Sequence, residues 1–282
     1  PEPIWPQRCV PGRSTHLLLC RHRSLRHGRV RTAHTRSRIR SHIPWWRGER
    51  SVDMARIDLS GTSVVILGGS GSLGSRIASL MSERGARITL AARDKRRLDA
   101  TASTIPGSVT AEFDLRNPDD ASIPIDTALE AFGSVNGIVN AAGVVAFGPL
   151  AQTEESVIDE VMEIDLVGPL RLYRRAIPLM DGGFILNLSG VIAAMPTAGM
   201  APYSAAKAGL AAASTALARE VRRDGITVID AQPPHTETGL VDRTIAGSAP
   251  SLPPGLDADA VAERLVLGVE SGERVMLADA FS

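Results

Sequence analysis

The feature that most constrains the fold of this chain is a cluster of glycines at residues 68–74, between an apolar run and a helical pattern. The run 64–67, VVIL, is mostly β-branched and too short for a helix, so it predicts a buried parallel strand. Residues 76–84 carry apolar side chains at helical spacing, which predicts an amphipathic helix directly after the turn. In this order of elements, the free amides of the helix N-terminus point at a bound pyrophosphate.

Two glycine spacings overlap in the turn, because GxGxxG and GxxGxxG can both be drawn through it. Either spacing lets the backbone approach phosphate groups, and a glycine-rich turn without a ligand is the alternative interpretation. The residues expected to contact a dinucleotide here are Gly68, Ser70, Gly71, Ser72, Leu73 and Gly74.

Strand patterns begin near residues 64, 88, 109, 135, 184, 226 and 274, and helical stretches separate them. This alternation predicts an α/β fold with a single doubly wound parallel sheet and helices on both faces. Ligands of such sheets gather beyond the carboxyl ends of the strands. Candidate residues follow a predicted strand in each case: Gly71, Arg93, Asp114, Asn140, Ser189 and Pro233.

A phenol and an ammonium group stand one helical turn apart at Tyr203 and Lys207. Residues four apart share a helix face, so the charge of Lys207 is expected to favour the phenolate and lower the pKa of Tyr203. Tyr203 is therefore a candidate general acid and base. The spacing alone also occurs on solvated helix faces, and its weight here comes from the glycine turn upstream.

The second strand ends at Arg93, where an acidic residue would bind the ribose 2′-hydroxyl of NAD. A guanidinium instead suits the 2′-phosphate of NADP, so NADP(H) is preferred and NAD(H) remains possible. Asp94 is expected either to pair with Arg93 or to cap the helix that begins near Lys95. Arg93 as a plain solvated loop residue is the competing interpretation.

With these motifs in order, residues 54–282 resemble the short-chain dehydrogenase/reductase family, whose dinucleotide-binding sheet is of the Rossmann type. The resemblance implies adenine contacts at Asp114 and Leu115 and nicotinamide contacts at Thr236 and Thr238. It also implies that Lys207 binds the nicotinamide ribose. The family's NNAG segment matches Asn140, Ala141, Ala142 and Gly143, and its PG-containing loop matches Pro233 followed by Pro234.

Two catalytic positions of the family differ in this chain. The family's serine falls on Gly190, and Ser189 beside it could substitute only through a local backbone twist, because neighbouring strand residues point to opposite faces. The family's asparagine falls on Asp165, which as a carboxylate accepts hydrogen bonds but cannot donate them. Asp165 could alternatively brace a helix break ahead of Gly168 and Pro169.

The resemblance implies an NADP(H)-dependent oxidoreductase that interconverts a small-molecule carbonyl and alcohol, with Tyr203 exchanging the proton. Because of the two departures, a catalytically impaired nucleotide-binding sensor or scaffold is the second hypothesis. The family also implies a homodimer or homotetramer. In the loop 239–256, Leu240, Ile245 and Leu252 either line an apolar substrate pocket or pin the loop to the core, and His235 before it is a candidate substrate contact.

Residues 1–53 differ in composition from the rest of the 282-residue chain, with 12 Arg, no Lys and 3 acidic residues. The remainder has 19 basic and 28 acidic residues, a net charge of −9, which does not favour nucleic-acid binding by residues 54–282. The first segment resembles a transit peptide or a nucleic-acid-binding arm. We expect it to be disordered or not native, because Met54 is a natural start ten residues before the first strand.

Both cysteines, Cys9 and Cys20, lie in that first segment without paired CxxC spacing, so no metal site is expected. The absence of cysteine from residues 54–282 fits a cytoplasmic protein. No continuous apolar run reaches the length of a membrane span, so no membrane partner is expected.

Overall fold

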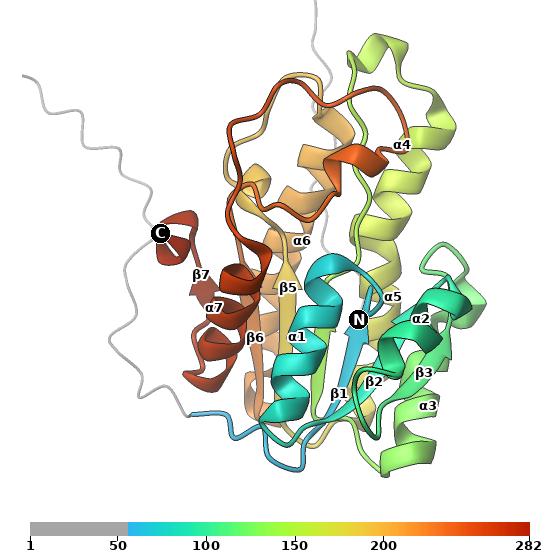
Figure 1. The fold of residues 1–282 in the computed structure, drawn as a ribbon, viewed down its shortest axis with the longest axis vertical. Helices are drawn as coiled ribbons and strands as arrows, with labels where there is room; N and C mark the ends of the chain where they lie inside the picture. The colour runs from blue at the N-terminus through green and yellow to red at the C-terminus, as the bar shows by residue number, and fades with distance from the viewer. Residues whose placement is uncertain (1–55) are drawn as a thin grey trace, which may run out of the picture. The chain divides into compact units, whose positions relative to one another are not determined.

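The computed structural model describes residues 56–282, in which seven parallel strands form one sheet of order β3-β2-β1-β4-β5-β6-β7 (Figure 1). The predictions for residues 1–53 lie outside the described residues. The strands are β1 (Ser63–Leu67), β2 (Arg87–Ala92), β3 (Val109–Glu112), β4 (Gly137–Asn140), β5 (Gly183–Leu188), β6 (Ile226–Ala231) and β7 (Val275–Met276). The α-helices are α1 (Ser72–Glu83), α2 (Lys95–Ala102), α3 (Ile123–Phe132), α4 (Glu155–Met162), α5 (Gly168–Ala176), α6 (Ala201–Glu220) and α7 (Ala258–Glu270).

The order of the strands reverses at β1, which pairs with β2 on one side and with β4 on the other. This is the doubly wound arrangement that the sequence predicts, and every strand begins within two residues of its predicted position. The crevice of such a sheet lies where the order reverses. The glycine turn after β1 stands at this point.

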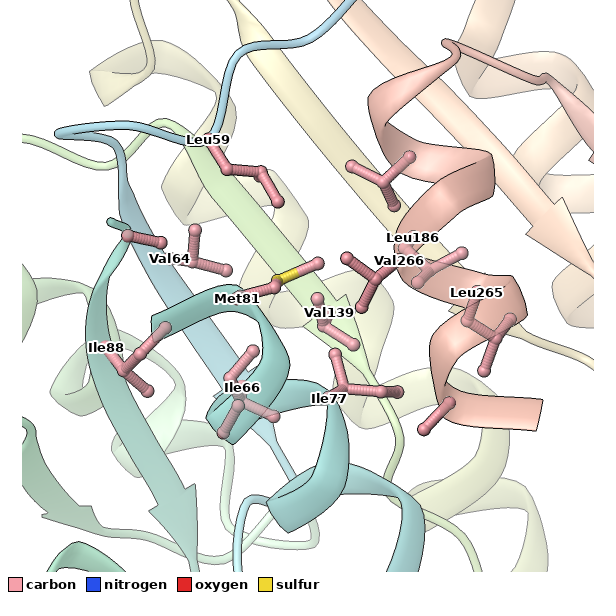
Figure 2. Packing of buried hydrophobic residues seen from close by; sticks show 14 of the residues in the cluster. Leu59, Val64, Ile66, Ile77, Met81, Ile88, Val139, Leu186, Leu265 and Val266 are labelled. Atoms are coloured by element: carbon pink, nitrogen blue, oxygen red, sulfur yellow. The ribbon is translucent and has the colours of Figure 1, made fainter. Parts of the chain in front are cut away.

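Alternate residues of β1 supply two separate cores, because successive side chains point to opposite faces of a strand. Val64 and Ile66 pack with α1 and α7 on one face, as Figure 2 shows. Val65 and Leu67 pack on the other face with residues of α3, α5 and α6. All five residues of β1 are buried, as expected for a strand covered by helices on both sides.

The N-terminal ends of α2 and α1 lie near the crevice and differ in their capping. Asp94 is the N-cap of α2 and accepts a hydrogen bond from the amide of Arg97 at 3.0 Å, which confirms the capping alternative for Asp94. The N-cap of α1 is Gly71, which has no side chain to cap the helix, so the first amides of α1 are left for another partner.

The predicted helical segment around residue 165 is a continuous helix whose central turn is π-helical. A π-helical turn, Glu163–Val167, joins α4 to α5, and Pro169 stands in the first turn of α5, where a proline needs no amide partner. Asp165 lies in this π-turn rather than at a break. Such turns are frequent at functional sites. No helix within residues 56–282 is long and apolar enough to span a membrane.

Candidate active site

A cavity of about 620 Å³ lies beyond the carboxyl ends of the strands and gathers residues from most of the predicted motifs. The predicted site residues that line it are Gly68, Ser70, Gly71, Ser72, Leu73, Arg93, Asp114, Leu115, Ala141, Ala142, Gly143, Ser189, Tyr203, Lys207, Pro233, Thr236 and Thr238. Gly74, Asn140 and Asp165 do not line it, and each acts behind the wall of the cavity.

The glycine turn is held close to its neighbours by backbone geometry. Gly68 has a φ of +71°, in the left-handed region, and a Cβ there would lie 2.8 Å from the amide nitrogen of Ala142. A Cβ on Gly74 would lie 2.2 Å from the carbonyl oxygen of Gly68. The turn, α1 and the loop after β4 therefore fit together only with glycine at these positions, which leaves the first amides of α1 facing the cavity.

Two arginines reach the end of the cavity formed by β2 and the glycine turn. Arg93 is about half exposed, and its Nη1 lies 3.8 Å from the carboxylate of Glu160. Arg97, which the sequence reasoning did not select, donates from Nη2 to the carbonyl oxygen of Ser70 at 2.8 Å. Its position four residues after Arg93 was the available signal. Both arginines line this end of the cavity, beside the carboxylates of Asp94 and Asp114.

Asp114 lies beside these arginines and is held by a third. Its carboxylate accepts hydrogen bonds from Arg116, and the pair is 2.6 Å apart at its closest atoms. Partial burial opposes ionisation, but the hydrogen bonds and charge of Arg116 outweigh it and hold the pKa of Asp114 below its usual value. Arg116 also pairs with Glu160 at 3.1 Å, so an ion-pair network borders the predicted adenine contact.

Asn140 is buried at the end of β4 and takes part in a polar network beneath the site. Its Nδ2 donates to Oδ1 of Asn187 at 3.4 Å, and Asn187 in turn donates to Oγ of Ser214 at 3.0 Å. The hydroxyl of Tyr173 donates to the same Oδ1 of Asn187. This network joins β4, β5 and α6, so Asn140 supports the strand ends instead of facing the cavity.

Tyr203 and Lys207 lie one turn apart on α6, with the Nζ of Lys207 5.8 Å from the centre of the Tyr203 ring. Lys207 is buried and donates to the carbonyl oxygen of Leu188 at 3.1 Å. Its Nζ also lies 3.6 Å from Oδ1 of Asp165. The predicted pair therefore forms at the cavity, with Asp165 as a third member behind it.

The protonation of this group differs from the expectation that Lys207 lowers the pKa of Tyr203. Burial, followed by the negative charge of Asp165, raises the pKa of the Tyr203 hydroxyl well above its ordinary value. Burial is the larger cause, because it penalises the charged phenolate, and the carboxylate of Asp165, paired with Lys207 at 3.6 Å, adds to the rise. Burial likewise raises the pKa of Asp165 to about 6, against the influence of Lys207 and the amide of Val144.

Neither Ser189 nor Gly190 supplies a hydroxyl to this arrangement. Ser189 is completely buried, and its Oγ donates to the carbonyl oxygen of Ala231 on β6 at 3.4 Å, so it would have to reorient to reach a substrate. Gly190 has φ +75° and ψ 162°, a backbone conformation used essentially by glycine alone. The backbone is thus twisted at Gly190, the condition under which Ser189 could substitute, but the hydroxyl of Ser189 bonds to β6.

The remaining wall is mainly apolar. Leu240, Ile245 and Leu252 all line the cavity, and Ile245 also packs against the core, so both interpretations of the loop hold for that residue. The hydroxyls of Thr236 and Thr238 bond to their own loop, at 2.9 Å to the oxygen of Pro234 and 3.3 Å to the amide of Leu240. The sequence reasoning missed other apolar lining residues in loops without a periodic pattern: Val145, Phe147, Ile192 and Met200. His235 lines the same wall.

Comparison with known proteins gives a consistent relationship. A protein-family model described as short chain dehydrogenase matches residues 62–248. Carbonyl reductase family member 4 of Danio rerio is 31% identical over 168 residues, which cover 58% of this chain and 71% of the relative. The 3-oxoacyl-[acyl-carrier-protein] reductase FabG of Vibrio cholerae is 29% identical over 188 residues, which cover 65% of this chain and 77% of the relative.

Solved structures show the same fold. A 3-ketoacyl-(acyl-carrier-protein) reductase from Brucella melitensis, complexed with NADH, superposes with a TM-score of 0.71 at 22% identity and covers 78% of this chain and 97% of its own. A dehydrogenase/reductase from Sinorhizobium meliloti has a TM-score of 0.70 at 26% identity, and the match covers 78% of this chain and 95% of that protein's chain. Since the family model spans more than half of the residues, the chain belongs to the short-chain dehydrogenase family of oxidoreductases.

Proposed function

We propose that this protein is an NADP(H)-dependent oxidoreductase that interconverts a carbonyl and an alcohol in a small molecule, with Tyr203 as proton donor and acceptor. The observation that carries the proposal is that Tyr203 and Lys207 line the same cavity as the glycine turn and the two arginines. A reacting group and a dinucleotide would thus occupy one continuous space.

The residues present fit a dinucleotide. The close approach of Gly74 to Gly68 leaves the uncapped amides of α1 for a pyrophosphate, which the helix dipole favours. The guanidinium groups of Arg93 and Arg97 favour a 2′-phosphate at the other end. The Brucella melitensis relative was solved with NADH, so the proposed preference for NADP(H) rests on these two arginines.

When bound, the nicotinamide supplies or accepts the hydride. In the reductive direction, the hydroxyl of Tyr203 would donate its proton to the substrate oxygen, and in the oxidative direction it would take that proton back. Lys207 would hold a charge beside the phenol and contact the ribose. The apolar side chains of Phe147, Ile192 and Leu252 would exclude water from the reacting carbon and suit a substrate that is largely apolar around its carbonyl.

A second candidate function is a nucleotide-binding sensor or scaffold that binds the coenzyme without turnover. Three observations favour it: Gly190 carries no hydroxyl, Ser189 is turned toward β6, and the pKa of Tyr203 is raised. Removal of one preorganised donor to a developing oxyanion commonly costs about 2.7–4 kcal/mol, which slows an enzyme without abolishing turnover. Because a loss of this size leaves measurable turnover, reductase activity is favoured over a sensor without turnover.

The test is a titration of the full chain with NADPH and NADH, followed by a panel of apolar ketones and aldehydes. Turnover that falls by at least about a hundredfold in Tyr203→Phe, with coenzyme binding retained, supports the oxidoreductase. Coenzyme binding with no turnover on any substrate supports the sensor. Failure to bind either coenzyme contradicts both functions. The cytoplasmic location and the homodimer or homotetramer stay predictions, the second to be measured by light scattering.

A further inference from the structure

A buried carboxylate stands directly behind the candidate catalytic pair. The side chain of Asp165 is completely buried in the π-turn Glu163–Val167, and its Oδ1 faces both the Nζ of Lys207, at 3.6 Å, and the amide of Val144, at 3.1 Å. Its Oδ2 is buried and has no hydrogen-bond partner among the described residues. Burying an ionised carboxylate with one unpaired oxygen costs free energy, which favours the protonated, neutral form of Asp165.

The close approach of these groups is built into the loop after β4. A Cβ on Gly143 would lie 2.8 Å from Oδ1 of Asp165 and 3.3 Å from the Nζ of Lys207. Glycine therefore lets the loop contact the ion pair directly. The ion pair is a packed part of the site wall, and neither partner can swing into solvent.

The charged and titratable groups around the ion pair come from three elements. Tyr203 on α6 experiences the charge of Asp165, and Asp230 on β6 interacts electrostatically with Lys207. Asp230 is itself buried and accepts a hydrogen bond from Nε2 of Gln232 at 2.9 Å. His235 in the loop after β6 lines the same cavity. The ammonium of Lys207 thus interacts with the two buried carboxylates of Asp165 and Asp230, whose negative charges reduce its effect on the phenol of Tyr203.

We propose that Asp165 is a positioning residue that, through its ion pair with Lys207, controls how readily Tyr203 releases its proton. Ionised Asp165 offsets the charge of Lys207 and keeps Tyr203 a weak acid. When Asp165 takes up a proton, its negative charge no longer opposes Lys207 at the phenol, and Tyr203 becomes a stronger acid. The consequence for turnover rests on the proposed function, whereas the effect on the phenol does not.

The pKa of Asp165, raised by burial to about 6, sets the pH at which this control would act. Below that pH the carboxyl is neutral, and above it the carboxylate weakens the acidity of Tyr203. An ordinary surface carboxylate is already ionised at that pH and would not change its charge there. If the proposed function holds, the reductive step would be favoured on the acidic side.

The sequence makes a direct test possible, because the chain contains only two tyrosines, Tyr173 and Tyr203. Tyrosine labelled at Cζ with an NMR-active carbon would give two resonances, and Tyr203→Phe assigns them. In the wild-type chain we expect the Tyr203 resonance to shift in a step with a midpoint near pH 6. The Tyr173 resonance serves as an internal reference, since that phenol is fully buried in the network with Asn187.

Three variants identify the group responsible. Asp165→Asn keeps an oxygen for Val144 and Lys207 and removes only the charge, so the step should disappear. Glu163→Gln removes a carboxylate from the same π-turn, but one that pairs with Arg171, so the step should remain. His235→Gln removes the histidine that lines the same cavity, and the step should remain in that variant as well.

A second measurement gives the size of the effect. The near-ultraviolet absorbance of the phenolate, followed to the onset of unfolding, should show Tyr203 ionising about one to three pH units lower in Asp165→Asn than in the wild type. Absence of the step in the wild type, its loss in His235→Gln, or superposable absorbance titrations would each overturn the proposal. The wild-type and His235→Gln spectra decide the matter even if Asp165→Asn fails to fold.

These readouts separate this inference from the proposed function. A Tyr203 step in a protein that binds no coenzyme would support the role of Asp165 and contradict the oxidoreductase. Normal turnover without a Tyr203 step would do the reverse. In an active enzyme, the pH profile of turnover in Asp165→Asn should also lose its limb near pH 6.

Discussion

Replacing Gly74 by alanine tests whether the glycine turn holds the coenzyme. A Cβ on Gly74 would lie 2.2 Å from the carbonyl oxygen and 2.9 Å from the carbonyl carbon of Gly68. Both atoms belong to the backbone, so no side chain can rotate away. Real Cβ contacts begin at 3.0 Å, and α1 must therefore move from the turn by roughly 0.8 Å.

The magnitude follows from two opposing effects. Overpacking commonly costs about 1–3 kcal/mol, and overlap with backbone belongs at the upper end. Alanine regains about 1 kcal/mol over glycine through helix propensity. The net loss is therefore about 2 kcal/mol, or about 4–8 °C in Tm for a domain of this size. Displacing α1 also removes at least one charge-assisted hydrogen bond to phosphate, about 1.5–3 kcal/mol, which weakens coenzyme binding roughly 10- to 150-fold.

The assay combines thermal unfolding by circular dichroism with calorimetric titration of NADPH. The matched control is Ser79→Ala on the same helix, because within residues 56–282 its hydroxyl hydrogen-bonds to the exposed carboxylate of Glu83, at 3.3 Å. That variant should keep both the wild-type Tm and the wild-type Kd. If Gly74→Ala also kept them, the turn would not be the phosphate site and the reasoning from backbone contacts would be refuted.

Three further predictions concern the coenzyme, the missing hydroxyl and pH. Arg97→Ala and Arg93→Ala should each weaken NADPH binding by about tenfold or more and leave NADH unchanged, measured by fluorescence titration; equal losses for both coenzymes would contradict a 2′-phosphate site. Gly190→Ser should lower the free energy of unfolding by about 1–3 kcal/mol in urea, because its backbone conformation is essentially restricted to glycine, although a Cβ there finds no atom closer than 3.9 Å; an unchanged stability would show that the turn relaxes freely. Because the folded-state pKa of Asp165 is raised to about 6 from its ordinary value of 3.8, its proton stabilises the fold at low pH, and that contribution is lost as pH rises through 6. The stability of Asp165→Asn relative to wild type should therefore rise over this range, by about 3 kcal/mol at most, and a flat difference would rule out the raised pKa.

Much of the fold follows from local patterns in the sequence. The apolar run of β1, the glycines after it and the spacing of Tyr203 and Lys207 lie within short segments, so their physics is read without tertiary contacts. The placement of candidate residues at one edge of the sheet also follows, because parallel strands end on the same side. Asp94 as the cap of α2 is a local hydrogen bond of the same kind.

The directions and charges of the side chains at the site depend on tertiary contacts that local sequence patterns do not specify. The hydroxyl of Ser189 bonds to Ala231 on β6, and the backbone twists at Gly190, neither of which a strand pattern specifies. Arg97 reaches Ser70 only because α2 packs beside the glycine turn.

The pKa of Tyr203 is the clearest example of what the tertiary structure adds. The sequence places Lys207 beside it and predicts an acidic phenol, whereas burial, with the added charge of Asp165 from a turn 38 residues before Tyr203, raises the pKa instead. Periodicity and turn chemistry are local properties, and the sequence by itself therefore determined the sheet, the glycine turn and the family. Desolvation and the field of a buried charge depend on every group within a few ångströms, so only the packing of distant segments decided how strongly the candidate catalytic residue Tyr203 holds its proton.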